Sequence, residues 1–212
     1  MNFRDELTFE HYDKERLLMP SIASRLTEEE NAFRHKVIEY IVANHQPYTP
    51  EGDEVALAKR IHDKKNVLVV EEDGKIYDIY PVTSEEMPHK VTLADGRVAY
   101  AMCAIDALGC TYTFDQDIVV DSECSNSGAP IHIEVKDKKI VSHSPDEIRV
   151  LNADLQNSEV WAEDCCCGML YFKSQKDFDE YAEKNHLCPD CTFCLSLEEA
   201  FSVARMLFSD NE

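Results

Sequence analysis

The sequence predicts an α+β fold, in which an N-terminal helical, winged-helix-like part packs on a C-terminal mixed α/β part with a small, mostly antiparallel sheet. Apolar residues recur at helical spacing in the first third of the chain, whereas β-branched runs dominate the middle. Two Asp-Gly pairs separate neighbouring β-branched runs and indicate hairpins. We expect a boundary near residue 85, which divides the chain into regions 1–85 and 86–212.

The first elements are predicted to be helices. Residues 7–25 predict one short amphipathic helix. Thr27 and Glu30 form a capping-box pattern that begins a longer helix, which Pro47 ends. Residues 54–62 suit a further helix.

Two strands follow these helices. Residues 66–70 and 76–80 flank Asp73-Gly74 and predict a hairpin. The order helix, helix, ribbon is that of a winged-helix module. Because the chain has no basic recognition face, we expect a scaffold rather than a DNA reader.

For region 86–212 we predict a sheet followed by two helices. Residues 91–93 and 98–100 flank Asp95-Gly96 as a second hairpin, and strand character recurs at 118–120, 131–135, 140–142 and 168–172. Two C-terminal helices are predicted at 176–185 and 197–208. Ser196 and Glu199 give the second of them a capping box.

Composition excludes several classes of protein. The 212 residues include 42 acidic and 21 basic side chains, a net charge of −21, so a nucleic-acid partner is not expected. No run approaches the roughly 18 apolar residues of a membrane span. The start of the sequence has no signal-peptide pattern, and we expect a cytoplasmic protein. In that compartment the nine cysteines should be reduced, and clusters of them indicate metal binding or catalysis.

Cys103 and Asp106 follow an apolar strand where the chain should turn into a helix. At positions i and i+3 they share one helical face, and a helix N-terminus favours a thiolate. The plainer interpretation is that Cys103 is a small buried hydrophobic residue. Cys110, after Gly109 at the expected helix end, has no assigned role.

Further cysteines cluster later in the chain. Cys165, Cys166 and Cys167 are adjacent, and successive residues of a strand face opposite sides, so packing alone does not explain them. Thiolates select thiophilic metals.

The cysteines at 188, 191 and 194 have a C-x2-C-x2-C spacing that could hold zinc or part of an iron–sulfur cluster. His186 or a thiol of 165–167 could complete such a site, and a redox-active or merely exposed thiol loop is the alternative. Cys124 lies in a turn-rich segment and is expected to be structural.

Three of these segments, in this order, resemble the organomercurial (alkylmercury) lyase family. Tyr100-Ala101-Met102-Cys103-Ala104-Ile105-Asp106-Ala107-Leu108 resembles its first catalytic segment. Ser122-Glu123-Cys124 with Gly128-Ala129-Pro130-Ile131 resembles the segment of its structural cysteine. The cysteine run before Tyr171-Phe172-Lys173-Ser174 resembles the segment of its second catalytic cysteine. The likeness covers roughly residues 25–208.

The resemblance implies protonolysis of a carbon–mercury bond, giving a hydrocarbon and Hg(II). By position, Cys103 and Cys166 would be the thiolate pair and Asp106 the proton shuttle, with Cys165 an alternative second thiol. It implies no additional cofactor, and Hg(II) would pass to small cellular thiols or to a mercuric reductase. Cys188, Cys191 and Cys194 could form a second site for zinc or another thiophilic metal.

Other functions remain open at this point. The nine cysteines also suit a non-catalytic metal-binding protein or metallochaperone on the same scaffold. The winged-helix order suits a metal-sensing regulator, although the acidic charge opposes DNA binding. Thiol redox chemistry is a further alternative.

Overall fold

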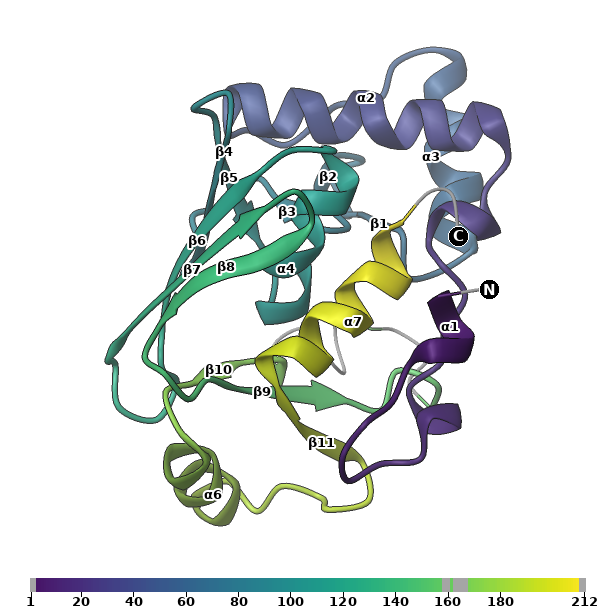
Figure 1. Ribbon diagram of the computed structural model, residues 1–212. Helices are drawn as coiled ribbons and strands as arrows, with labels where there is room; N and C mark the ends of the chain where they lie inside the picture. The colour runs from purple at the N-terminus through teal and green to yellow at the C-terminus, as the bar shows by residue number, and fades with distance from the viewer. Residues whose placement is uncertain (1–2, 158–160, 162–167, 210–212) are drawn as a thin grey trace.

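The computed structural model describes residues 3–157, 161 and 168–209, which form two sheets with helices packed around them (Figure 1). The α-helices are α1 (Phe3–Glu6), α2 (Glu28–Asn44), α3 (Asp53–Asp63), α4 (Ala104–Thr113), α6 (Gln175–Lys184) and α7 (Leu197–Phe208). Two short 3-10 helices span Lys14–Arg16 and Ala23–Arg25.

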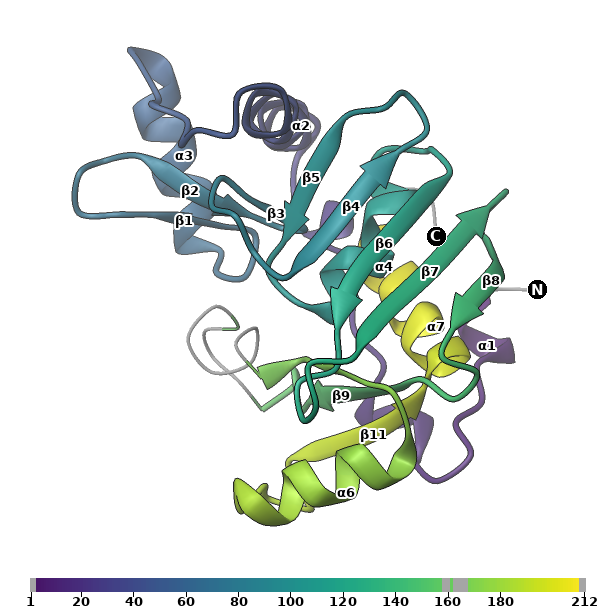
Figure 2. The ribbon, with the colours of Figure 1, turned by 90° about the vertical axis from the view of Figure 1, so that its left-hand side faces the viewer.

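An eight-stranded antiparallel sheet forms the larger layer, in the order β1-β2-β3-β5-β4-β6-β7-β8. Its strands are β1 (Leu68–Val70), β2 (Ile76–Ile79), β3 (Val82–Thr83), β4 (His89–Leu93), β5 (Val98–Ala101), β6 (Ile118–Glu123), β7 (Pro130–Lys136) and β8 (Lys139–Ser144). Figure 2 shows this sheet with α4 and α7 behind it and α2 across its upper end. In β4 the residues His89, Val91 and Leu93 are buried and alternate with more exposed ones, as expected for a strand with one face on the core.

The second sheet has three antiparallel strands in the order β10-β9-β11. They are β9 (Arg149–Ala153), β10 (Tyr171–Phe172) and β11 (Thr192–Ser196). Helix α6 packs beside this sheet at the lower end of the molecule (Figure 1). The apolar residues of both sheets and the helices belong to one continuous core.

In the N-terminal part, the longer helices were predicted correctly. Thr27 caps α2, and its side chain and that of Glu30 form both capping-box hydrogen bonds. The Asp73-Gly74 hairpin is confirmed, since β1 and β2 pair across it. The single helix predicted for residues 7–25 is wrong, because that segment contains two 3-10 helices within otherwise irregular structure.

The hairpin β1–β2 is part of the large sheet. Strand β2 pairs with β3, and β3 pairs with β5, so the sheet runs continuously across the predicted boundary near residue 85. The boundary and the winged-helix character stay predictions. The sheet itself is larger than predicted, because these N-terminal strands extend it.

In the C-terminal part, the hairpin at Asp95-Gly96, the strands β6 to β8 and the helices α6 and α7 are confirmed. The strands β9 and β11 were missed here, and β3 was missed at the end of the N-terminal part. Helix α4 extends to Thr113, so Cys110 lies inside it rather than at its end. None of the helices in the described residues is long and apolar enough to span a membrane.

Candidate functional site

The candidate site begins where β5 passes into α4. Cys103 has an extended backbone conformation and is the N-cap of α4, and its Sγ atom accepts a hydrogen bond from the backbone N–H of Asp106 at 3.4 Å. Cysteine is an unusual cap, since oxygen-bearing side chains are preferred there. The thiol is completely buried. Its position places it against the positive end of the helix dipole.

Asp106 lies on the first turn of α4, and its side chain returns to Cys103. The Cys103 thiol donates a hydrogen bond to Asp106 Oδ2 at 3.0 Å, and Asp106 is only 2% exposed. Burial raises the pKa of the Asp106 carboxyl to about 8; the hydrogen bond from Cys103 opposes this shift and the charge of Asp78 adds to it. The carboxyl can therefore carry a proton at neutral pH.

Buried aromatic side chains lie next to the start of α4. The Tyr171 hydroxyl donates a hydrogen bond to the carbonyl oxygen of Ala104 at 2.8 Å. His89 packs edge-on against the Tyr171 ring, with centroids 5.5 Å apart, and shares a 2.8 Å hydrogen bond through Nδ1 with Ser122 Oγ. Burial lowers the pKa of His89 to about 4, so this imidazole is neutral at pH 7.

The segment that follows the cysteine run is tied directly to the start of α4. Ala104, next to Cys103, donates its backbone N–H to the carbonyl oxygen of Met169 at 3.0 Å. The next carbonyl, of Leu170, accepts from the backbone N–H of Leu151 at 2.9 Å. The predicted residues Cys165, Cys166 and Cys167 lie outside the described residues.

Two other predicted cysteines lie in the core. Cys110 is buried on α4, and burial raises the pKa of its thiol. Cys124 is buried in the turn between β6 and β7, where its Sγ atom donates to Asp177 Oδ1 of α6 at 3.7 Å. The structural role of Cys124 stays a prediction, and these contacts are compatible with it.

The C-terminal cysteines are arranged differently from the prediction. Cys188 and Cys191 form a disulfide, so the expectation that all the cysteines are reduced is wrong for this pair. Cys194 lies in β11, its Sγ atom donates to Gln175 Oε1 at 3.5 Å, and burial raises the pKa of its thiol to about 11. Within the described ranges, no group of three or more His, Cys, Asp or Glu side chains is placed to hold a metal ion. Zinc or another metal at this loop stays a prediction.

Three residues near the site were given no role by sequence reasoning, although Ser122 and Tyr171 lie within the motifs quoted above. These residues are His89 of β4, Ser122 of β6 and Tyr171 of β10. No local sequence pattern predicts that their side chains come into contact. Asp78 was also missed. It lines a surface hollow of about 450 Å³ together with Glu71, Glu72, Asp73, Tyr77 and Glu85.

Comparison with known proteins gives a consistent result. A family model described as alkylmercury lyase matches residues 82–209. An alkylmercury lyase of Bacillus cereus and one of Clostridium butyricum are each 26% identical over 161 residues, which is 75% of this chain and 70% of each relative. An alkylmercury lyase of Staphylococcus epidermidis is 23% identical over 175 residues, covering 79% of this chain and 77% of that relative.

A solved structure shares the fold. The mercury-bound form of MerB2 superposes with a TM-score of 0.71 at 20% identity, over 87% of this chain and 92% of that one. The mixed α+β architecture with a mainly antiparallel sheet is thus common to both.

Proposed function

The chain belongs to the alkylmercury lyase family, and we propose that it cleaves the carbon–mercury bond of organomercurials by protonolysis, with Cys103, Cys166 and Asp106 as the reacting groups. The observation that carries this proposal is the 3.0 Å hydrogen bond from the Cys103 thiol to Asp106 Oδ2 in a fully buried setting. A soft sulfur ligand and a proton carrier are thereby in contact.

The contact between this thiol and this carboxyl suits proton exchange. Burial raises the pKa of the Asp106 carboxyl to about 8, and the Cys103 thiol donates a 3.0 Å hydrogen bond to it. The carboxyl can therefore hold a proton at neutral pH and act as a general acid. Asp106 accepts a proton from a cysteine thiol and delivers it to the departing carbon.

The complete reaction balances with two thiols. An organomercurial R–Hg–X exchanges X for cysteine sulfur, and a second sulfur then binds mercury and increases the electron density on the bound carbon. Asp106 protonates that carbon as the C–Hg bond breaks. The sum is R–Hg–X plus two thiols giving R–H, a dithiolate complex of Hg(II), and H–X.

Cys166 is proposed as the second sulfur from its place in the motif. It precedes Met169 by three residues, and three residues of chain span at most about 11 Å. Because the Met169 carbonyl is hydrogen-bonded to Ala104, the chain can bring a thiol from this run to Cys103. Cys165 is the alternative, and separate alanine variants at the two positions distinguish them.

The remaining parts of the proposal concern the product. No additional cofactor is needed, because the protein supplies both sulfurs and the proton. Hg(II) is a product, and it leaves by exchange with small cellular thiols or with a mercuric reductase.

The deciding experiment measures benzene released from phenylmercury acetate by the reduced protein with excess small thiol. We expect catalytic benzene formation in the wild type and at least a 100-fold loss in Cys103→Ser and in Asp106→Asn, because general acid–base catalysis contributes about 10²–10⁴-fold. Cys110→Ala removes a thiol from the same helix and is the matched control, which should retain activity.

The outcome separates the candidate functions. Benzene release at the wild-type rate in Cys103→Ser or Asp106→Asn would contradict the mechanism. Tight mercury binding by the wild type without any hydrocarbon product would instead favour a non-catalytic metal carrier on the same scaffold.

A further inference from the structure

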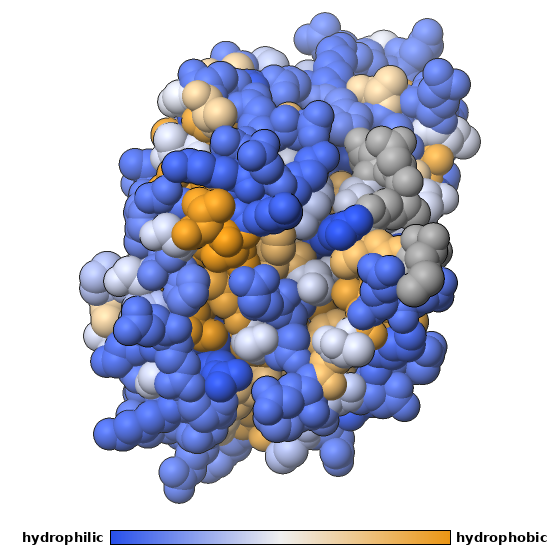
Figure 3. Space-filling model, in the orientation of Figure 1, coloured by the Kyte–Doolittle hydropathy of each residue, from blue (hydrophilic) through white to orange (hydrophobic). Residues whose placement is uncertain are grey.

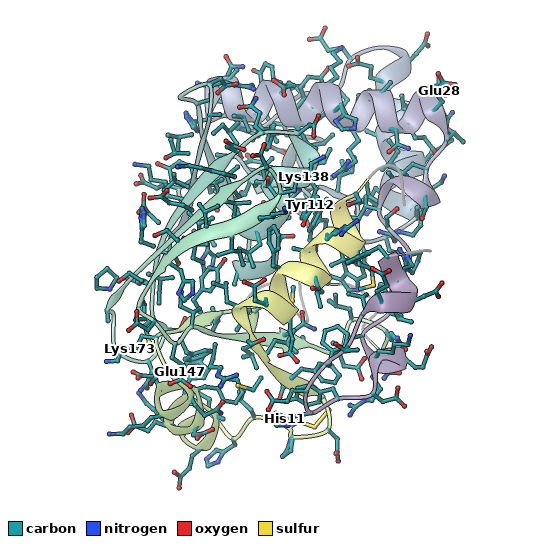
Figure 4. The ribbon with its side chains drawn as sticks, in the orientation of Figure 1. His11, Glu28, Tyr112, Lys138, Glu147 and Lys173 are labelled. Atoms are coloured by element: carbon teal, nitrogen blue, oxygen red, sulfur yellow. A yellow bond between two sulfur atoms is a disulfide. The ribbon has the colours of Figure 1, made fainter. Side chains whose placement is uncertain are left out.

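The loop between α6 and β11 carries a pair of cysteines that the proposed reaction does not use. Cys188 and Cys191 are both exposed, are joined as a disulfide, and have Cα atoms 5.2 Å apart. The yellow bond at the lower edge of Figure 4, near the label of His11, marks this disulfide. An exposed disulfide is accessible to attack by small thiols, which convert it to two thiols.

The backbone holds the two cysteines together independently of the S–S bond. The carbonyl oxygen of Cys188 accepts from the N–H of Cys191 at 3.1 Å and from Thr192 Oγ1 at 2.9 Å. The carbonyl oxygen of Cys191 accepts from the N–H of Asp154 at 3.0 Å. The reduced thiols therefore stay side by side, as a preorganised pair.

A cation also lies at this loop. The Arg16 guanidinium donates to the carbonyl oxygen of Asp190, between the two cysteines, at 2.5 Å, and it covers the Phe193 ring at 4.7 Å. These two contacts attach the loop that carries the cysteine pair to the N-terminal segment.

The number and type of ligands at Cys188 and Cys191 indicate which metal ions this pair can bind. A structural zinc site needs four ligands, but among the described side chains no third His, Cys, Asp or Glu joins this pair. Cys194 is directed to Gln175 instead. Two thiolates without further donors suit a soft ion that is satisfied by two sulfur ligands, and Hg(II) is such an ion.

The loop is connected to the candidate site through the small sheet. In the small sheet, Cys194 of β11 pairs with Leu151 of β9, and the N–H of Leu151 donates to the carbonyl oxygen of Leu170. Leu170 follows Met169, which is bonded to the start of α4. Strand β9 alone therefore lies between β11, which follows the cysteine pair, and the segment Met169–Leu170, which contacts the start of α4.

We propose that Cys188 and Cys191, once reduced, form a surface Hg(II) site that receives the metal from the catalytic cysteines. This role rests on the proposed function, which supplies the Hg(II). Two small thiols reduce the disulfide and leave as their own disulfide. The two surface thiols then bind mercury as thiolates, and their two protons return to the catalytic sulfurs, so that atoms and charge balance.

Mercury stoichiometry tests the site directly. The full chain is reduced, freed of reductant, equilibrated with HgCl₂ and glutathione as competitor, and assayed for bound mercury. We expect about one Hg(II) per chain fewer in the double variant Cys188→Ser/Cys191→Ser than in the wild type, since only a thiolate pair competes with glutathione. Cys194→Ser is the matched control and should bind as the wild type does. Equal binding by the double variant and the wild type would overturn the site.

Transfer is tested by cleavage without any external thiol. With excess phenylmercury acetate, the reduced wild type should release about two benzene molecules per chain and the double variant about one, because only the wild type can clear its catalytic sulfurs. A burst of about one in both proteins would overturn the transfer. No benzene from the wild type, with the difference in mercury binding intact, would refute the proposed lyase but leave the surface site standing.

Discussion

At the scale of single residues, the burial of Asp106 has a thermodynamic cost that depends on pH. The pKa of its carboxyl is raised from 3.8 to about 8 in the folded chain, mainly by burial. As pH rises between these values, the unfolded chain loses the proton freely while the folded chain retains it. Folding therefore becomes less favourable across this window, and the contribution is absent below it.

Asp106→Asn should remove this dependence. Relative to the variant, the wild type should lose up to about 1.4 kcal/mol of stability per pH unit between about pH 5 and about pH 8. Urea unfolding of both proteins across this range measures the difference. A difference that stays constant with pH would show that the carboxyl ionises as readily in the folded as in the unfolded chain.

The charge of Asp78 should affect the pKa of Asp106. Its negative charge helps to raise the pKa of Asp106, so Asp78→Asn should lower that pKa and shift the alkaline limb of the cleavage-rate profile to lower pH. Glu72→Gln is the control, because Glu72 lines the same surface hollow and is not among the groups that shift Asp106. An equal shift in both variants would indicate a general effect of surface charge.

Sequence reasoning predicted the contact in one half of this site and did not predict the contacts in the other half, for a physical reason. Cys103 and Asp106 are three residues apart, and helical geometry alone brings them together. His89, Ser122 and Tyr171 meet through the pairing of β4 with β6 and the docking of β10. Such contacts depend on tertiary structure and leave no periodic signal in the sequence.

At the scale of elements, the contact between α4 and α7 depends on one glycine. A Cβ atom at Gly109 would lie 2.2 Å from Phe208 Cδ2, and Phe208 is only 2% exposed and cannot move aside into solvent. The absence of a side chain at this position thus allows the two helices to approach closely.

Gly109→Ala should therefore destabilise the protein by about 1–3 kcal/mol through overpacking. The sign is opposite to that of an ordinary Gly-to-Ala change in a helix, which gains about 1 kcal/mol. Denaturant unfolding measures the change. Phe208→Leu supplies the control, because the double variant should be more stable than the two single changes predict; strict additivity would argue against this contact.

The elements that sequence analysis predicted well share a local signal. The capping boxes at Thr27 and Ser196 and the turns at Asp73-Gly74 and Asp95-Gly96 all lie within a few residues. Strand β3 has only two residues, and β11 follows the cysteine loop that drew attention to metal ligands. Strand β11 pairs with β9, which lies far away in the sequence, and β3 pairs with the adjacent β2 and the more distant β5. A local pattern does not reveal the distant pairings.

At the scale of the whole molecule, the two predicted regions share a sheet and a core. The family match begins at residue 82, within β3, although β2 pairs with this strand on one side and β5 on the other. Trp161 adds a further link. Its indole packs edge-on against Tyr80 at 5.9 Å, and its backbone N–H donates to Asn66 Oδ1 at 2.8 Å.

The chain should consequently unfold in one cooperative transition. Trp161 is the single tryptophan, and its fluorescence reports the contact between the two regions, whereas far-UV circular dichroism reports all elements. Coincident midpoints and equal denaturant slopes are expected from the two probes. Separate midpoints would instead establish that residues 1–85 and 86–212 unfold independently.

The placement of the thiols should affect whether a thiophilic metal causes the protein to aggregate. A metal that binds one exposed thiol on each of two molecules cross-links them, and repeated cross-linking precipitates a protein. In the described part of the chain, Cys103, Cys110 and Cys124 are buried, Cys194 is half-buried, and the exposed Cys188 and Cys191 are neighbours. Neighbouring thiols chelate within one molecule because the second sulfur is always near the first. Together with the largely hydrophilic face in Figure 3, this arrangement should limit cross-linking between molecules if the chain binds Hg(II) as proposed.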